Sequence, residues 1–338
     1  MGRMSLFLVL GLSLAFGIIG FSMRGTTNYL VEAQTGYSKY IFARNLARTA
    51  IHTTLRAYDR SLPTIPTSGS FSGGSYVVQH SEIGDTLWIT STGMYADSTY
   101  TMKTKLLRTT KPFPQVSAAI GIRATPVKFS ISGQAEVDGH NWDSTGTNLV
   151  GYGNVPGVAT MKGSDSVTVT KAGGDIDGVP PVKVDTSTID PLPFLDEYKL
   201  NADYVYNMSG VYNSASWGSS SNPAIVYCNA GDDTSFSIKF TGNVVGYGIL
   251  VVKGNVQFNG NFSFYGLVVV DGFNTMVQFG AAGTPQVVGG VIVAGNAGAS
   301  VMLKGTGSEA KVKYSSAALD KARRIGKLRY YSIIEWYE

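Results

Sequence analysis

The chain of 338 residues carries a formal net charge of +4, and 15% of its residues are charged, against about 25% in a typical soluble domain. It has 41 glycines and one cysteine, Cys228, so an internal disulfide is excluded. Positive charge is not gathered into the basic stripe of a nucleic-acid-binding protein, so nucleic acid is not among the expected partners. Few charges and many glycines favour an extracellular β-rich protein over a cytosolic enzyme.

The first predicted element is a membrane-spanning helix. Residues 4–23 contain no charged side chain, and a helix of that length covers ~30 Å, the thickness of a bilayer core. A cleaved secretory signal is the alternative, but its apolar region is shorter, ~7–15 residues, and ends at a small-residue cleavage site that is not evident here. The side chains expected to make membrane and assembly contacts are large and apolar: Leu6, Leu8, Leu10, Leu12, Phe16, Ile18 and Phe21.

The same helix is predicted to continue as an amphipathic segment. Apolar residues from Leu30 to Tyr58 recur at intervals of three or four, with basic residues between them, and no proline occurs before Pro63. We therefore expect a membrane-spanning plus amphipathic helix over residues 1–61. Three alternating runs follow, at 75–80, 86–91 and 98–107, and they predict a small antiparallel sheet packed on the helix within residues 62–125.

The C-terminal half contains a repeated apolar phrase that ends at glycine. Its four copies begin at residues 224, 247, 265 and 289, which gives steps of 23, 18 and 24 residues. A period near twenty predicts a parallel β-helix, or solenoid, over residues 126–314; an antiparallel sandwich is the alternative. Residues 167–170 and 182–184 are expected to add strands, residues 190–203 a short helix, and residues 315–338 a helix followed by a closing strand.

A long helix that is apolar and then amphipathic, followed by β structure, resembles a type IV pilin. The phrases SISGQAEVDGH, YGILVVKG and YGLVVVDG and the tail ending in IIEWYE are similar to those of PilX-like pilus-assembly proteins. The resemblance implies a minor-pilin-like or pseudopilin-like structural protein that contacts the membrane and other pilin-type subunits through its helix. One departure is that no acidic residue precedes Glu32, whereas pilins carry a glutamate at the fifth mature position.

The expected location is the inner membrane, crossed once with the body in the periplasm, or the cell surface within a pilus. Surface glycans or cells are possible partners of the solenoid. The alternative function is a surface adhesin, or a carbohydrate-binding or carbohydrate-cleaving β-helix protein, that acts independently of pili.

Residues that suggest chemistry are few. Asp138 and Asp143 flank Trp142, and Asp175 and Asp177 are two residues apart; these aspartates are weak candidates for a cation site, and Trp142 for contact with a sugar. A polar corner loop of the solenoid is the favoured interpretation of the group around Trp142. Asp175 and Asp177 lack the further ligands of a full calcium loop. No catalytic constellation or cofactor motif stands out, so we expect a non-enzymatic protein without a cofactor.

Overall fold

The computed structural model describes residues 2–59, 64–186, 190–231, 238–305 and 310–338, with the backbone alone for residues 2–8 and 310. The chain forms two compact units. One comprises Met1–Thr109 together with Tyr330–Glu338, and the other is Thr110–Arg329. The second unit is therefore inserted in the chain between two elements of the first.

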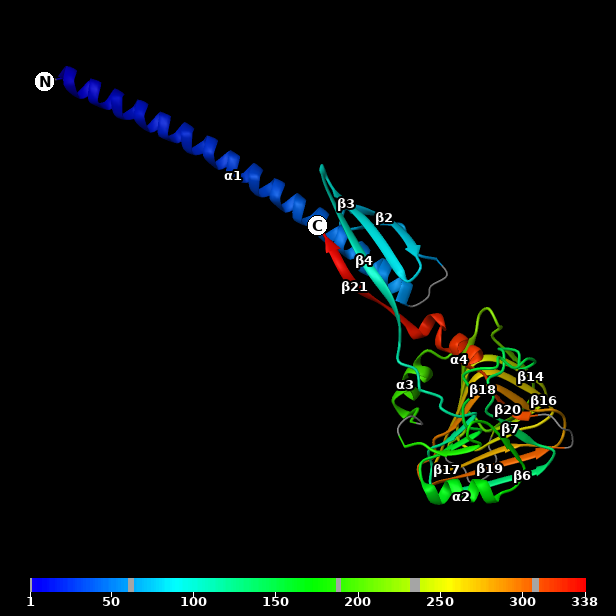
Figure 1. Ribbon diagram of the computed structural model, residues 1–338. Coiled ribbons are helices and arrows are strands. Elements are labelled where there is room, and N and C mark those ends of the chain that lie inside the picture. Colours follow the sequence, from blue (N-terminus) through cyan, green and yellow to red (C-terminus); the bar gives the residue numbers. More distant parts are fainter. Residues whose placement is uncertain (1, 60–63, 187–189, 232–237, 306–309) are drawn as a thin grey trace. The chain divides into compact units, whose positions relative to one another are not determined.

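The first unit begins with α1 (Gly2–Asp59), a single helix that confirms the continuous helix expected from the sequence (Figure 1). No other element of the described chain packs on its first half, whereas its second half lies on a sheet. There, small residues such as Ala43, Ala47 and Ala50 are fully buried and let the strands approach the helix closely.

The sheet of this unit has five strands in the order β1–β2–β3–β4–β21. Strands β1 to β4 pair in an antiparallel manner, as predicted. In β3, buried and half-buried residues alternate, because one side of the sheet packs on α1 and the other side does not. The bounds are β1 Ser68–Phe71, β2 Gly74–Ile83, β3 Thr86–Tyr95, β4 Ser98–Thr110 and β21 Arg329–Tyr337.

The sheet approaches the helix backbone closely at Gly93 in β3. A Cβ atom at this position would lie 2.1 Å from the carbonyl oxygen of Ala43 and 2.6 Å from the nitrogen of Ala47. Both atoms belong to the helix backbone, so no side chain can move aside. Glycine is therefore required if the strand is to lie this close to the helix.

The second unit is a 16-stranded, curled, parallel sheet, so the predicted parallel solenoid is confirmed. Its helices are α2 (Gly163–Lys171), α3 (Leu192–Leu200) and α4 (Ser316–Arg323), followed by a short 3-10 helix, η1 (Gly326–Leu328). Its strands are β5 Ile120–Ile122, β6 Val127–Gly133, β7 Glu136–Asp138, β8 Val158–Thr160, β9 Asp175–Asp177, β10 Val182–Val184, β11 Tyr204–Tyr206, β12 Gly210–Trp217, β13 Ala224–Asn229, β14 Ile238–Lys253, β15 Val256–Phe258, β16 Asn261–Asp271, β17 Asn274–Phe279, β18 Gln286–Val293, β19 Gly298–Gly305 and β20 Ala310–Tyr314.

Strand pairing gives the solenoid three faces. The first contains β20, β7 and β9 beside the later part of β12, the middle of β14 and the earlier parts of β16 and β18. The second contains β11, β13, β5, β8 and β10 beside the later parts of β14, β16 and β18. The third contains the starts of β12 and β14 with β15, β17, β19 and β6. The long strands β14 and β16 bend from one face to the next.

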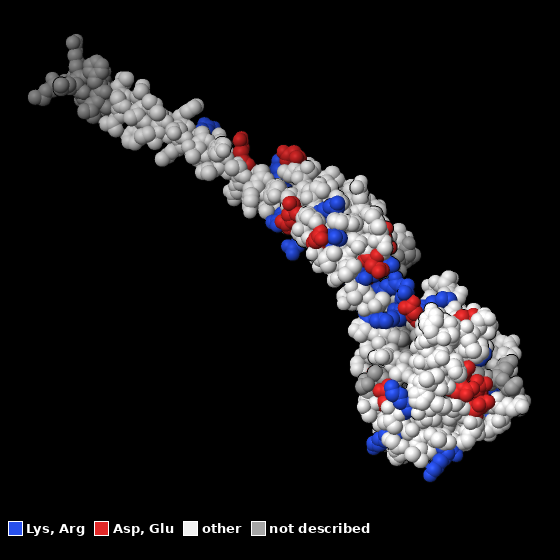
Figure 2. Space-filling view, viewed as in Figure 1, with Lys and Arg blue, Asp and Glu red and all other residues white. Residues whose placement is uncertain are grey.

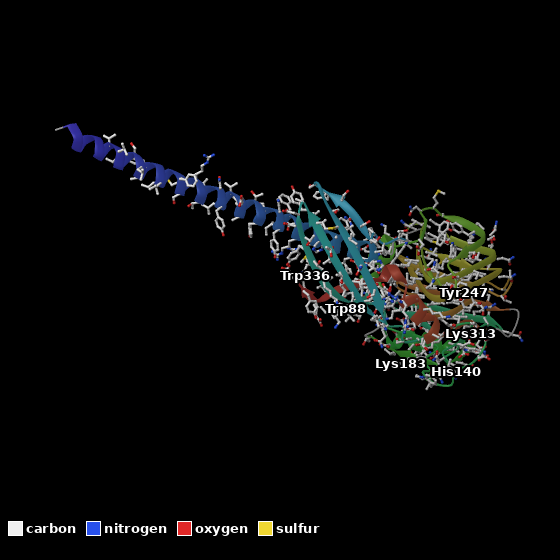
Figure 3. The ribbon with its side chains drawn as sticks, turned by 90° about the horizontal axis from the view of Figure 1, so that it is seen from above. Trp88, His140, Lys183, Tyr247, Lys313 and Trp336 are labelled. Atoms are coloured by element: carbon white, nitrogen blue, oxygen red, sulfur yellow. The ribbon has the colours of Figure 1, made fainter. Side chains whose placement is uncertain are left out.

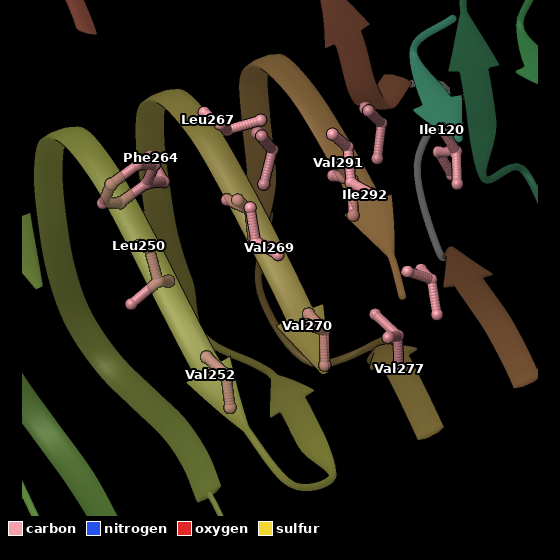
Figure 4. Packing of buried hydrophobic residues seen from close by; sticks show 14 of the residues in the cluster. Ile120, Leu250, Val252, Phe264, Leu267, Val269, Val270, Val277, Val291 and Ile292 are labelled. Carbon is pink, nitrogen blue, oxygen red and sulfur yellow. The ribbon is translucent and has the colours of Figure 1, made fainter. Parts of the chain in front are cut away.

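Equivalent residues of successive coils stack inside this unit. Phe240, Phe258 and Phe279 are paired in register, and their ring centroids are 5.7 and 4.9 Å apart. On the second face the four residues from Ile249 to Val252 are each at most 1% exposed, so both sides of these strands are buried. Figure 4 shows the same stacking for Val252 and Val270, which are paired in register. Burial on both sides explains the continuous apolar phrases in the sequence.

The order of coils in space differs from their order in the chain. Strand β18 pairs with β20 on the first face and with β5 on the second, and β19 pairs with β6 on the third. One coil is thus assembled from the last strand of this unit and its first two. The chain enters and leaves the solenoid in this coil, and the segment from β7 to β10 stacks beyond it.

Two details of the sequence interpretation need correction. The boundary between the units follows Thr109 rather than residue 125, because β5 belongs to the solenoid. The sequence did not reveal this strand, since β5 has only three residues and cannot show a repeating pattern. The strand expected at 167–170 is wrong, since these residues lie in α2. Their β-branched side chains favour strands, but the helix buries Val169 and packs on β6. The short helix expected at 190–203 is confirmed as α3. The strand expected at 182–184 is confirmed as β10.

The predicted final segment, residues 315–338, is divided between the units. Helix α4 covers strands of the solenoid. Strand β21 instead completes the sheet on α1 as the neighbour of β4. Thr104 of β4 donates a hydrogen bond to the carbonyl oxygen of Glu335, and Lys105 lies 3.1 Å from the carboxylate of the same residue.

Candidate functional site

The apolar first half of α1 is a candidate interaction surface of the first unit. The predicted contact residues described there are strongly exposed, at 61% for Leu10, 48% for Leu12, 67% for Phe16, 62% for Ile18 and 82% for Phe21. The side chains of the other two candidates, Leu6 and Leu8, lie outside the described residues. Figure 2 shows few charged side chains along this half of the helix. A row of exposed apolar side chains on a helix is stable in lipid or against other apolar helices.

Among the described residues, α1 is the one helix that is long and apolar enough to cross a membrane, over the stretch Val9–Asp59. Gly11, Gly17 and Gly20 lie within its apolar half, and nothing in the described chain comes within 4 Å of a Cβ built on them. Small residues at such positions allow a second helix to approach closely in a membrane. The helix therefore offers both a lipid-facing surface and positions for lateral packing.

The basic residues of the second half of α1 partly pair within their own chain. Arg44 forms an ion pair with Glu338, and the hydrogen bond from its guanidinium raises the pKa of Arg44. Lys39 lies 2.9 Å from Asp97. Both basic side chains thus pair with acidic residues of their own unit. The two histidines of this unit also have contacts within it. The ring of His52 lies near that of Trp336, and the ring of His80 shares a 2.7 Å hydrogen bond with the hydroxyl of Tyr58.

The polar group around Trp142 is built on Asp138, which is only 4% exposed. One carboxylate oxygen of Asp138 accepts hydrogen bonds from the backbone and ring nitrogens of His140, at 2.8 and 2.7 Å. The other accepts a 2.8 Å hydrogen bond from the indole nitrogen of Trp142. Both oxygens are therefore engaged by protein donors, and a cation would have to displace them.

Trp142 is held on its ring face as well as its edge. The ammonium of Lys313 lies 4.4 Å from the ring centroid, in a cation–π contact. The same ammonium donates a 3.0 Å hydrogen bond to the carbonyl oxygen of Gly146. His140 and Lys313 can be followed in Figure 3. A sugar could stack on Trp142 only where Lys313 does not cover it.

Asp143 organises the loop that follows. Its carboxylate accepts hydrogen bonds from the backbone and hydroxyl groups of Thr145 and Thr147 and from the amide of Asn148. Desolvation raises the pKa of Asp143, but these hydrogen bonds outweigh it and hold the pKa well below the ordinary value. The carboxylate is ionised and satisfied within its own loop, which is the behaviour of a loop-forming aspartate.

Asp175 and Asp177 lie in β9, in register with Glu136 and Asp138 of β7. Burial, together with the charges of Asp138, Asp175 and Asp177, raises the pKa of Glu136. Despite this accumulation of acids, no group of three or more His, Cys, Asp or Glu side chains in the described residues is arranged to hold a metal ion. The four aspartates considered from the sequence therefore do not converge into one site.

What this polar group does hold is the beginning of α4. The side-chain oxygen of Asn141 accepts a hydrogen bond from the backbone nitrogen of Ser316, at 2.9 Å. The hydroxyl of Ser315, the N-cap of α4, donates to the carbonyl oxygen of Asp143 and accepts from the backbone nitrogen of Ala318. The group fastens the chain where it leaves the solenoid. Asn141 and Ser315 could not be identified from the sequence, because their partners are more than 170 residues away.

Comparison with known proteins gives no relative for this chain: no family model, no curated protein and no solved structure matches it.

Proposed function

We propose that this chain is a membrane-anchored structural protein of the minor-pilin or pseudopilin kind, which displays a β-solenoid on the far side of the membrane for adhesion or assembly contacts. The observation that carries the proposal is α1. One uninterrupted helix combines an exposed apolar half with a half that is packed against an antiparallel sheet. A pilin-type subunit requires both properties, because its helix must lie in a bilayer and also carry a folded domain.

The insertion of the solenoid supports a display role. Both chain connections of the solenoid leave from neighbouring strands, β4 and β21, of the sheet that packs on α1. A large unit can then be carried by the pilin-like part without interrupting its core. Lateral contacts of the apolar half of α1 with other pilin-type helices are part of this proposal.

A non-enzymatic role is also proposed. In the described part of the chain, the buried aspartate with the most partners, Asp138, is engaged by three hydrogen bonds from its own loop. Asp143 is engaged in the same way. A glycosidase would need two carboxyl groups that are free to act as acid and as base or nucleophile.

Membrane attachment is tested by fractionation of cells that express the full chain. We expect the protein in the membrane fraction after alkaline carbonate washing, and a Leu12→Arg/Phe16→Arg variant to be released or degraded, since each charge at a bilayer centre costs roughly 2.5–3.5 kcal/mol. A Gly36→Arg variant, in the exposed but more polar part of α1, is the matched control. Carbonate release of the unmodified chain would contradict anchoring.

Pilus association requires a separate experiment. Sheared surface filaments from the native host are labelled with an antibody to the solenoid, with and without the assembly ATPase of the pilus machine. We expect labelling that depends on the ATPase. Unchanged surface labelling without the ATPase would favour the alternative, an adhesin that is displayed independently of pili.

A further inference from the structure

The two ends of the solenoid differ in how their strand edges are protected. At one end, which we call the closed end, α2 packs on β6 of the third face, where the next strand would otherwise lie. Strands β9 and β10 are three residues each, and Pro180 and Pro181 come directly before β10. Asp175, Asp177 and Lys183 add charge there (Lys183 is labelled in Figure 3). Short strands, prolines and charges are the means by which proteins prevent pairing at a sheet edge.

The other end, which we call the open end, consists of β11 and β12. Strand β11 is as short as β9 and β10, with three residues, but β12 has eight. The segment 204–217 contains no charged residue and no proline. Strand β11 pairs only with β13, and β12 only with β14, among the described strands. The outer edges of both strands therefore present backbone N–H and C=O groups that no described strand satisfies.

Apolar side chains at the open end are exposed to a degree unusual for a solenoid terminus. Val205 is 51% exposed, Met208 75% and Val211 57%. Terminal repeats of solenoid proteins normally carry a polar outer surface, because the terminal coil lacks a neighbour to cover its apolar residues. An uncharged edge with exposed apolar side chains is a template for a further strand.

The open edge is ordered by an aromatic layer beneath it. The indole of Trp217 donates a 3.0 Å hydrogen bond to the hydroxyl of Tyr206. The rings of Tyr206 and Tyr212 are 4.9 Å apart in an edge-to-face contact, and Trp217 packs in the same way on Phe240. This layer closes the core and fixes β11 and β12 in place. A strand that docks there would find the edge already formed and would lose less entropy on binding.

We propose that the open end is an interaction surface that pairs, edge to edge, with the open end of a second copy of this chain. The absence of charge over 204–217 means that two identical edges do not repel each other. Pairing of the open end with the closed end is disfavoured by Asp175, Asp177 and the two prolines. Contact between identical ends closes after two subunits, so the product is a two-fold dimer rather than a filament. Such pairing would hold whether or not the chain enters a pilus.

Cysteine cross-linking tests this pairing. Cys228 is fully buried, and burial raises its pKa to about 12. We therefore expect it not to form disulfides that compete with those of an introduced cysteine. Full-length protein in detergent carrying Val205→Cys, Met208→Cys or Val211→Cys is oxidised mildly and examined on non-reducing gels. We expect at least one variant to form a covalent dimer in several-fold higher yield than Val184→Cys, the control at the closed end, which is 43% exposed.

A charge variant separates end-to-end pairing from association through α1. We expect Val211→Lys to weaken the dimer at least about tenfold in sedimentation equilibrium, since two like charges would meet in the paired edges; Val184→Lys should leave it unchanged. Unaltered thermal unfolding of both variants shows that they remain folded. A dimer that persists in Val211→Lys, cross-linking yields equal to the control, or mixed cross-links between Val211→Cys and Val184→Cys chains would overturn the proposal.

Discussion

The sheet on α1 and the solenoid bury their strands in different ways. In β3, every second residue from Leu87 to Gly93 is buried, because only one side meets the helix. In β16, five consecutive residues from Gly266 to Val270 are buried. The sheet therefore depends on α1 for its core, whereas the solenoid supplies its own core by stacking coils. Damage to one unit is expected to leave the other folded.

The largest loss of stability is expected from a substitution at Gly266, a glycine of the repeated apolar segment in β16. Gly266 has φ +139°, and a Cβ atom there would lie 2.0 Å from the carbonyl oxygen of Gly248 in the adjacent coil. Gly266→Ala therefore combines backbone strain with a clash against backbone, and we expect a loss of more than about 4 kcal/mol in the stability of the solenoid. Denaturant unfolding followed by hydrogen exchange of the segment 247–270 measures it.

The control for that change is Gly163→Ala in the same unit. Gly163 begins α2, and no atom lies within 4 Å of a Cβ built on it. We expect a change of no more than about 1 kcal/mol, because alanine is the better helix former. Equal losses in the two variants would show that the stacked Gly266 does not limit the stability of the solenoid.

A smaller effect, confined to the other unit, is expected at Gly93. Gly93→Ala should push β3 away from the backbone of α1 and cost about 1–3 kcal/mol, the typical range of overpacking. Hydrogen exchange should increase in β3 and β4 and remain unchanged in β16. Gly36→Ala, at an open position on α1, is the matched control. Joint unfolding of both units would contradict their independence.

The smallest effect concerns one carboxylate in each unit. The pKa of Asp143 in the folded chain lies below the ordinary value of about 3.9, so its contribution is present above pH ~4 and is lost as the pH falls below that value. We expect amide protection of Thr145 and Thr147 to fall roughly severalfold from pH 5 to pH 2.5, and Asp143→Asn to remove this dependence.

Asp97 is the counterpart in the sheet unit. Its pKa is also lowered, by the hydrogen bond from Lys39, but the pair is exposed to solvent. We expect 0.5 M salt to weaken the Asp97 pair, which is screened, and to leave the Asp143 loop unchanged. An equal response of both sites to salt would show that the Asp143 loop is held by charge rather than by directed hydrogen bonds.

Local pattern was enough to identify most elements. The helix over residues 2–59, the three paired strands β2 to β4 and the four long solenoid strands follow from periods of 3.6, 2 and about 20 residues, which are visible within a short window of sequence. The strand expected at 167–170 failed because propensity is weak against packing: α2 forms where Val169 can be buried beside β6.

The candidate site was harder to predict. The sequence directed attention to Asp138, Trp142 and Asp143 as possible ligands. In the structure, the carboxylates of Asp138 and Asp143 accept hydrogen bonds from neighbours such as His140, Thr145 and Asn148. The indole of Trp142 donates to Asp138, and the carbonyl oxygen of Asp143 accepts a hydrogen bond from the N-cap of α4. Hydrogen-bond partners such as Asn141 and Ser316 are 175 residues apart, so no local signal reports them.

The sequence by itself determined that the chain has one long apolar and amphipathic helix, a small antiparallel sheet and a parallel solenoid, because each depends on a repeating pattern of burial. Only the tertiary structure decided that one coil is completed by β20, β5 and β6, that β21 returns to the sheet on α1, and that one end of the solenoid is closed and the other open. These features depend on contacts between segments remote in the chain, and such contacts leave no period in the sequence.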